Sequence, residues 1–352
     1  MLQAASVEEA NRLRRLGPVR AWLHVIALLV LLMVLVGGIT RLTDSGLSIT
    51  QWKPISGTLP PLSAADWQAE FDAYKLIPEY QIQNHWMSLE EFKSIFWWEW
   101  GHRFLGRFIG AAFLIPFLVF LWQKRLDRTL APALGGLFVL GGLQGALGWW
   151  MVSSGLTERV DVSQYRLAAH LGAAALLFAA LVYVARTMAP RPVVAPVRRN
   201  WRLWVGLFAV LVFVQIVAGA LVAGLDAGMG YNTWPLMDGA LVPDGLDAMS
   251  PVWVNLFENA MTVQFVHRLI AYALVVFALA LLWAGRGLRF GARPHVFMAL
   301  VAVLVLLQVV LGIGVLVMSV PVSLAVMHQG FAFVLFGTVV AYLADMRQIA
   351  VL

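Results

Sequence analysis

The 352-residue sequence contains no cysteine. Disulfide bridges, thiolate nucleophiles, iron–sulfur clusters and cysteine-attached heme are therefore excluded. Charged residues are also scarce, at 12% of the chain, whereas 61% of the chain is hydrophobic. The mean hydropathy of +0.80 lies far above that of a soluble domain. The composition therefore predicts an all-α integral membrane protein.

Eight apolar stretches have the length of about 20 residues that crosses roughly 30 Å of hydrocarbon as a helix. We expect them at residues 22–40, 104–122, 130–152, 166–185, 203–224, 265–284, 296–318 and 323–344. The N-terminus carries acidic residues among its arginines and lacks a cleavable signal pattern, so the first stretch is expected to remain as an anchor.

The net charge of +6 is distributed by membrane side. Sixteen basic residues flank one side of the spans, where the positive-inside rule places the cytoplasm: Arg12, Arg14, Arg15, Arg20, Lys124, Arg125, Arg128, Arg186, Arg191, Arg198, Arg199, Arg202, Arg286, Arg289, Arg293 and Arg347. The opposite loops collect acidic residues. We therefore expect both termini in the cytoplasm, a multi-pass protein of a bacterial inner membrane, lipid as its surroundings and no nucleic-acid partner.

Four sequence markers occur twice in the same order. Asp44-Ser-Gly46 followed by Trp52 matches Asp226-Ala-Gly228 followed by Trp234, with eight residues from Asp to Trp in both. The other pairs are His102-Arg103 with His267-Arg268, Gln144-x-x-Leu147-Gly148 with Gln308-x-x-Leu311-Gly312, and His170-x-Gly172 with His328-x-Gly330. Such internal self-similarity indicates a duplicated architecture.

The duplication predicts two pseudo-symmetric four-helix bundles, residues 1–190 and residues 191–352. Each half holds four spans, so both have the same orientation in the membrane. The stretch from Arg186 to Arg202 joins them, and its prolines, Pro190, Pro192 and Pro196, argue against a continuous helix.

The first outer loop, roughly residues 41–96, is the longest. The interval from Asp44 to His102 is 58 residues, against 41 from Asp226 to His267. The excess includes Ala64–Tyr74 and Ser88–Phe96, whose mixed aromatic and acidic residues predict short amphipathic helices at the interface. A roof over a pocket, a partner site and a plain surface flap all remain open for this loop.

Four histidines, His102, His170, His267 and His328, fall within about two turns of the outer end of alternate spans. Even-numbered spans run in one direction, so equal offsets bring these side chains to one depth. Polar groups at membrane depth are costly and usually functional, and imidazole is the usual protein ligand of heme iron. Two facing pairs predict two heme sites, whereas His24, His85 and His295 have no repeat partner and are interpreted as structural or solvated.

The residues beside the histidines fit a flat cofactor. Glycines next to the ligands leave room for a macrocycle, although glycine also serves plain helix packing: Gly101, Gly106, Gly110, Gly172 and Gly330. Arg103 and Arg268 follow the first ligand of each half, where a guanidinium can bind a heme propionate or extend toward lipid phosphate.

The two halves differ three residues before their first histidine. Glu99 holds that position before His102, and Gln264 holds it before His267. Residues i and i+3 share a helix face, and a carboxylate can move protons or stabilise developing positive charge, whereas an amide cannot titrate. We expect chemistry in the first half and a redox heme in the second, with a plain capping role for Glu99 as the alternative.

Together these features resemble the heme A synthase family. The resemblance covers nearly all of residues 20–345. Leu47-Ser-Ile-Thr-Gln-Trp-Lys-Pro54 and Trp97-Trp-Glu-Trp-Gly-His-Arg103 are similar to the alphaproteobacterial and mitochondrial branch. Members of the other branch carry cysteine pairs in their outer loops, so any disulfide-linked role proposed there cannot operate here.

The resemblance implies oxidation of the C8 methyl of heme O to a formyl group by two successive hydroxylations. It assigns His267 and His328 to a heme b cofactor in the C-terminal half. It assigns His102 and His170 to the substrate heme in the N-terminal half, with Glu99 in catalysis. Heme O synthase and cytochrome oxidase assembly factors are the partners it adds, and the sequence does not indicate the electron donor.

Two other functions use the same features. A diheme b-type electron-transfer protein would use the four histidines without chemistry on the heme, and the difference between Glu99 and Gln264 argues against it. A transporter would use the parallel repeats, but the spans lack the acidic groups near the midplane that such sites favour.

Overall fold

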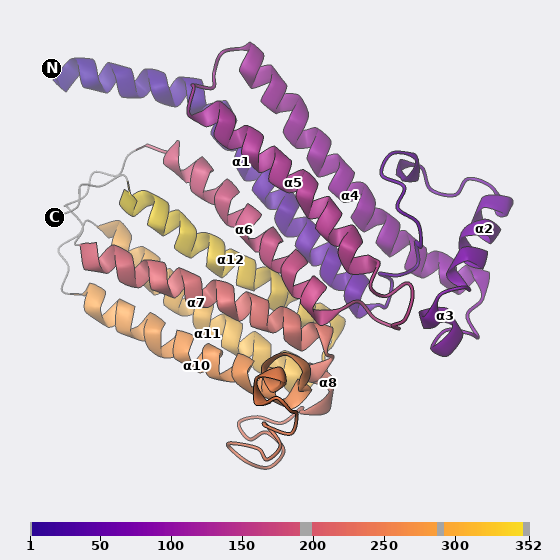
Figure 1. The fold of residues 1–352 in the computed structure, drawn as a ribbon. Coiled ribbons are helices and arrows are strands. Elements are labelled where there is room, and N and C mark those ends of the chain that lie inside the picture. The colour runs from indigo at the N-terminus through magenta and orange to yellow at the C-terminus, as the bar shows by residue number, and fades with distance from the viewer. Residues whose placement is uncertain (1, 191–198, 287–291, 348–352) are drawn as a thin grey trace.

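The computed structural model describes residues 2–190, 199–286 and 292–347 (Figure 1). The middle of the predicted linker, with Arg191, Pro192, Pro196 and Arg198, lies outside these residues, as does Arg289. The side chains of Arg199, Arg293, His295 and Arg347 are likewise outside the described part.

Eight long helices are apolar enough to cross a membrane in the described ranges. They are α1 (Leu2–Leu42), α4 (Leu89–Trp122), α5 (Leu130–Val152), α6 (Gln164–Thr187), α7 (Arg199–Gly224), α10 (Ala260–Gly285), α11 (Ala292–Val317) and α12 (Val322–Arg347). No β-strand occurs in those ranges, so the predicted all-α class and the eight spans are confirmed. The first residue of α1 and the last of α12 lie at one end of the molecule, opposite the short helices of the loops (Figure 1).

The long helices contact one another in two closed rings. α1 contacts α4, α4 contacts α5, α5 contacts α6, and α6 contacts α1. In the second ring α7, α10, α11 and α12 follow the same order, and α12 closes on α7. α4 therefore lies diagonally across its ring from α6, and α10 lies diagonally across from α12.

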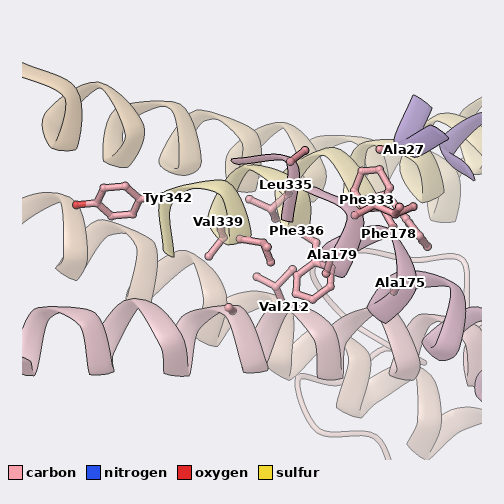
Figure 2. Packing of buried hydrophobic residues seen from close by; sticks show 14 of the residues in the cluster. Ala27, Ala175, Phe178, Ala179, Val212, Phe333, Leu335, Phe336, Val339 and Tyr342 are labelled. Carbon is pink, nitrogen blue, oxygen red and sulfur yellow. The ribbon is translucent and has the colours of Figure 1, made fainter. Parts of the chain in front are cut away.

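An aromatic core lies where the two rings meet, between α1, α6, α7 and α12 (Figure 2). Phe333 of α12 is fully buried, and its ring meets that of Phe178 of α6 edge to face, with centroids 5.6 Å apart. Ala175 and Ala179 of α6 are also buried, and these small side chains leave space for the aromatic rings of α12. Between helices in lipid, such contacts stabilise the fold by close packing and not by removal from water.

The first outer loop contains α2 (Ala64–Tyr74) and α3 (Pro78–Ile82) besides a short 3-10 turn, η1 (Ser56–Thr58). α2 has the predicted bounds and begins with a capping box in which Ser63 and Asp66 exchange hydrogen bonds. The separate helix predicted at Ser88–Phe96 is wrong, because this segment is the first part of α4. A capping box between Ser88 and Glu91 starts that helix.

Buried aromatic side chains explain why α4 extends so far beyond its apolar span. Phe92 and Phe96, four residues apart and therefore on one helix face, are buried against α2. The Phe92 ring lies 5.0 Å from that of Phe71 and 5.3 Å from that of Tyr74, between centroids. The outer end of α4 and α2 thus form a small core of their own.

The second outer loop has only short helical turns: α8 (Ala227–Gly230), η2 (Val252–Val254) and α9 (Asn255–Glu258). Its start mirrors that of the first loop, since Asp44 and Asp226 both adopt a left-handed φ of 48°. Aspartate tolerates this conformation better than most residues. The repeated Asp-x-Gly motif therefore makes the same turn at the outer ends of α1 and α7.

A single arginine at the outer end of α1 binds carboxylates from both duplicated segments. The Arg41 guanidinium lies 3.4 Å from an Asp44 oxygen, 3.5 Å from an Asp161 oxygen and 3.0 Å from an Asp226 oxygen. At the opposite end of the molecule, Arg186 of α6 makes a bidentate pair with Asp345 of α12. Ion pairs thus link the two rings at both ends.

Candidate functional site

The four predicted histidines lie on the diagonal helices of the two rings. His102 is on α4 and His170 on α6, whereas His267 is on α10 and His328 on α12. His170, His267 and His328 follow the first residue of their helices by six, seven and six residues, as predicted. His102 lies thirteen residues into α4, so the expected offset of about two turns is wrong there, because α4 begins early in the outer loop.

The contacts of α1 place one histidine of each pair at a similar level. A Cβ at Gly37 would lie 3.0 Å from His102 Nε2, and a Cβ at the next residue, Gly38, would lie 2.7 Å from the amide oxygen of Gln329. Gln329 is the chain neighbour of His328. His102 and His328 therefore lie at the same height on two sides of α1.

His267 and His328 are spaced as two ligands of one metal ion would be. The ring centroids of His267 and His328 are 6.5 Å apart, with the planes inclined at 76°. A metal ion about 2 Å from one nitrogen of each ring requires centroids roughly 6 Å apart. Nδ1 of both rings is buried and has no hydrogen-bond partner in the described part of the chain. Two imidazoles at this centroid distance, each with an unpartnered ring nitrogen, fit an iron ligated from both sides.

The first pair is more open. The ring of His102 makes no hydrogen bond with any residue that the structure describes. Nothing lies within 4 Å of a Cβ at Gly101 or Gly110 on α4, nor at Gly141, Gly142 or Gly145 on α5. These glycines of α4 and α5 therefore border unfilled space, and Gly141, Gly142 and Gly145 are exposed on the surface of the bundle.

Glycines of the neighbouring helices, more than those next to the histidines in sequence, make room for the rings. A Cβ at Gly37, Gly148, Gly219 or Gly312 would lie 3.0–3.2 Å from the ring of His102, His170, His267 or His328, respectively. Among the glycines singled out in the sequence, Gly106, Gly172 and Gly330 pack against Met33, Val217 and Leu35 instead. Only Gly101 and Gly110 face open space, as a macrocycle would need.

Glutamines hold three of the four histidines, a role that the sequence analysis missed. Gln144, Gln215 and Gln308 donate through Nε2 to the backbone oxygens of His170, His267 and His328, at 2.7, 3.0 and 3.0 Å. Gln144 and Gln215 also lie 3.2 and 3.3 Å from a ring nitrogen of the same histidine. The signal was the duplicated Gln-x-x-Leu-Gly motif, which places the glutamine one turn before the glycine that meets the ring.

Glu99 does not stand free beside His102. Its Oε2 accepts hydrogen bonds from Ser48 Oγ at 2.7 Å and from the backbone N–H of Ile49 at 2.6 Å. Its Oε1 accepts from Nε and Nη2 of Arg103. The side chain is buried, with 3% exposure. Four donors thus satisfy an ionised carboxylate.

Arg103 also binds the first outer loop, where it donates to the backbone oxygens of Ile49 at 2.8 Å and Gln51 at 3.0 Å. In the second half, Arg268 donates to Gln264 Oε1 at 2.8 Å and to Tyr231 O at 3.0 Å. Both arginines therefore fasten an outer loop to the helix that carries the histidine. Their predicted contact with propionates stays a prediction.

The difference between Glu99 and Gln264 has a local structural counterpart. Gln264 donates through Nε2 to Ala227 O at 2.6 Å, whereas Glu99 accepts from the loop N–H and O–H groups. The first loop offers donors and the second offers an acceptor, so each residue matches the loop above it. This match supports the capping alternative for Glu99 without excluding a part in chemistry.

The remaining histidines lie apart from these groups. His24 Nδ1 is bonded to the backbone oxygen of Arg20, one turn earlier in α1, and His85 is exposed in the loop after α3. Both agree with a structural or solvated role.

A buried carboxyl group, Glu79 of α3, lies beneath the first outer loop. It is 3% exposed, and its Oε2 has no partner in the described ranges. Burial, reinforced by the negative charges of Asp44, Glu99 and Asp161, raises the pKa of Glu79 to about 8. Burial also raises the pKa of Asp44, and Arg41 opposes that change.

We expect the outer loop to lose stability as the pH rises from about 4.5 to about 8, because the folded state holds a proton on Glu79 that the unfolded state has released. The loss reaches at most roughly 4 kcal/mol at pH 8. Glu79→Gln should flatten this pH dependence in thermal unfolding followed by tryptophan fluorescence. The exposed Glu90 provides the control variant Glu90→Gln, and parallel curves for wild type and Glu79→Gln would contradict the expectation.

Comparison with known proteins decides the family. The family model described as cytochrome oxidase assembly protein, COX15-CtaA, matches residues 20–340. The chain belongs to the COX15-CtaA family. Among relatives named heme A synthase, a protein of Azorhizobium caulinodans is 57% identical over 338 residues, covering 94% of this chain and 95% of that protein.

Two further relatives are also named heme A synthase. A protein of Chelativorans sp. is 55% identical and covers 95% of this chain and 92% of its own length. A protein of Parvibaculum lavamentivorans is 51% identical and covers 91% of both chains. The COX15-CtaA match spans all eight helices and includes the four diagonal histidines.

Proposed function

We propose that the chain is an oxidoreductase that converts heme O to heme A. It would oxidise the C8 methyl group of heme O to a formyl group by two successive hydroxylations. Each replaces a C–H bond by C–OH, either from water with a two-electron acceptor or from dioxygen with a two-electron donor, and the geminal diol then loses water. The facing pair His267 and His328, with centroids 6.5 Å apart, is the observation that carries a heme site. The relatives named heme A synthase support the reaction.

His267 and His328 are the proposed ligands of a heme b cofactor in the C-terminal half, residues 191–352. Their unpartnered Nδ1 atoms and the unpartnered amide oxygens of Gln215 and Gln308 are all buried. A metal-ligating imidazole donates its other N–H to an acceptor, and these amide oxygens are acceptors on the adjoining helices. Heme bound there supplies one-electron transfer.

His102 and His170 are the proposed ligands of the substrate heme in the N-terminal half, residues 1–190. The open glycines of α4 and α5 support a pocket that must admit and release a large molecule. Glu99 would act on this substrate by stabilising positive charge next to the porphyrin or by accepting a proton at Oε1 or Oε2. Arg103 holds the carboxylate in place and is the proposed propionate ligand of this pocket, as Arg268 is in the other.

The proposed address is a bacterial inner membrane with both termini in the cytoplasm. The same-end position of the helix termini (Figure 1) and the basic residues at that end support this orientation. Heme O synthase and cytochrome oxidase assembly factors are the proposed partners, on the description of the family model as a cytochrome oxidase assembly protein.

The test is chromatography of extracted heme after co-expression with a source of heme O. Heme A should appear with the wild-type chain and be absent from the same cells without it. Intact protein with a competent electron supply and no heme A would contradict the proposed reaction.

One observation favours the alternative of a diheme b-type electron-transfer protein. Glu99 is fully hydrogen-bonded within the outer loop network, so its difference from Gln264 no longer counts against that alternative by itself. The alternative predicts two hemes of unchanged chemistry in the same extraction.

A further inference from the structure

Each histidine rests on a neighbouring helix in the same way, with one exception. The membrane helix that precedes it in the chain supplies a glycine that lies against the ring: Gly37 of α1, Gly148 of α5, Gly219 of α7 and Gly312 of α11. Four residues before the glycine stands Gln144, Gln215 or Gln308 in the last three cases. Each of these amides donates to the backbone oxygen of its histidine.

An amide in this place restricts the histidine in two ways. Its N–H group fixes the backbone oxygen of the residue that carries the ring, and its second N–H or its oxygen can meet a ring nitrogen. Partners of the second ring nitrogen orient metal ligands and typically contribute 10–100-fold to metal affinity. Gln144 and Gln215 lie within reach of a ring nitrogen, whereas Gln308 meets the backbone oxygen of His328. A histidine held in this way keeps its position when the iron changes its oxidation state or its other axial ligand.

The exception is His102. The residue four positions before Gly37 is Met33, which has no N–H group to donate. Its methyl group lies 3.3 Å from the place of a Cβ at Gly106, one turn after His102. The backbone oxygen of His102 accepts no side-chain hydrogen bond in the described ranges, in contrast with that of His328, which accepts from Gln308.

We propose that Gln144, Gln215 and Gln308 are positioning residues that hold His170, His267 and His328 as lasting iron ligands, and that Met33 leaves His102 free to release the iron. The inference rests on the proposed function and distinguishes the two ligands of the substrate heme. His170 is held in place, and His102 can be displaced from the iron. A pocket that must admit heme O and discharge heme A needs such a ligand, whereas the resident heme needs none.

The experiment compares Gln308→Met, which gives the second half the residue found at position 33, with the reciprocal Met33→Gln. Purified protein is loaded with iron protoporphyrin, reduced, and exposed to carbon monoxide, which binds heme iron only where an axial ligand leaves. In wild type, carbon monoxide should bind the first pocket alone. Gln308→Met should open the resident heme to carbon monoxide and speed its loss to heme-free myoglobin by about tenfold or more.

Met33→Gln should have the opposite effect in the first pocket. We expect slower carbon monoxide binding and slower heme release there by about tenfold, with a larger share of six-coordinate, low-spin iron in the optical and electron paramagnetic resonance spectra. Met33→Leu, which adds no donor, should behave as wild type.

Gln329→Met is the matched control, because Gln329 lies on α12 next to His328 and, like Gln308 of α11, donates an amide N–H to a backbone oxygen, in this case Val34 O at 3.0 Å. It removes a bond of the same kind next to His328 without touching a histidine carbonyl. Equal effects of Gln329→Met and Gln308→Met would show general loosening of α12 and overturn the proposal. So would an unchanged Gln308→Met, or a Met33→Gln protein that folds and exchanges heme as wild type.

The loading step separates this inference from the proposed function. Wild type that takes up no iron protoporphyrin overturns both. Wild type that binds two hemes but never forms heme A overturns the proposed reaction alone, and the carbon monoxide results then still decide whether His102 can be displaced from the iron.

Discussion

The His267→Ala variant is expected to be purified without its resident heme. Removing one of two facing imidazoles leaves the iron with a single axial ligand and a cavity in place of the ring. Since outer partners of metal ligands alone contribute 10–100-fold to affinity, loss of a ligand itself should weaken retention by more than about 100-fold. His328→Ala should behave alike, and the pyridine hemochrome spectrum of each purified variant measures the loss.

Variants of the histidines in the first half should differ in effect from those in the second half. His102→Ala and His170→Ala are expected to keep the resident heme and to lose formation of heme A. His24→Ala, which alters an exposed ring bonded to its own helix, should change neither quantity. If His267→Ala keeps the resident heme and His102→Ala loses it, the heme cofactor lies in the N-terminal half and the substrate pocket in the C-terminal half.

The Glu99→Gln variant is expected to lower the rate of heme A formation by about 10²-fold, the usual effect of a catalytic carboxylate or charge-stabilising group. The resident heme should stay, because the ligands His267 and His328 lie in the other ring. Heme A per unit of protein, measured over time by chromatography, gives the rate, and the optical spectrum gives the resident heme.

Ser48→Ala distinguishes chemistry from loop anchoring. Ser48 donates to Glu99 Oε2, so its removal weakens the link to the loop but keeps the carboxylate. A modest loss of a few-fold is expected. If Ser48→Ala costs as much as Glu99→Gln, the carboxylate acts by holding the loop, and if Glu99→Gln leaves the rate of heme A formation unchanged, the carboxylate has no part in the reaction.

The sequence was sufficient to predict the spans and the histidine positions, because both depend on patterns along one chain. Apolar length gives the number of membrane helices, and the duplicated markers align His102 with His267 and His170 with His328. The equal φ of Asp44 and Asp226 shows that the repeated motif also repeats its backbone.

What the sequence could not predict depends on contacts between helices. The glutamines touch histidines 20 to 52 residues away, and only the register of two packed helices shows which side chain an amide meets. Glu99 and Arg103 likewise appeared to point at a pocket, but the loop from Ser48 to Gln51 folds back onto them. The early start of α4 follows from burial of Phe92 and Phe96 against α2, which no local hydropathy window contains.

The three carboxylates around Arg41 have a consequence for how the two bundles depend on each other. Asp44 and Asp226 occupy matching positions of the repeated motif, but the residue in α7 that corresponds to Arg41 is Ala223, so one cation serves both carboxylates. Three carboxylates thus share one guanidinium. A fragment encoding the second bundle alone would lack Arg41 and leave Asp226 without this cation, which makes the outer end of that bundle dependent on the first.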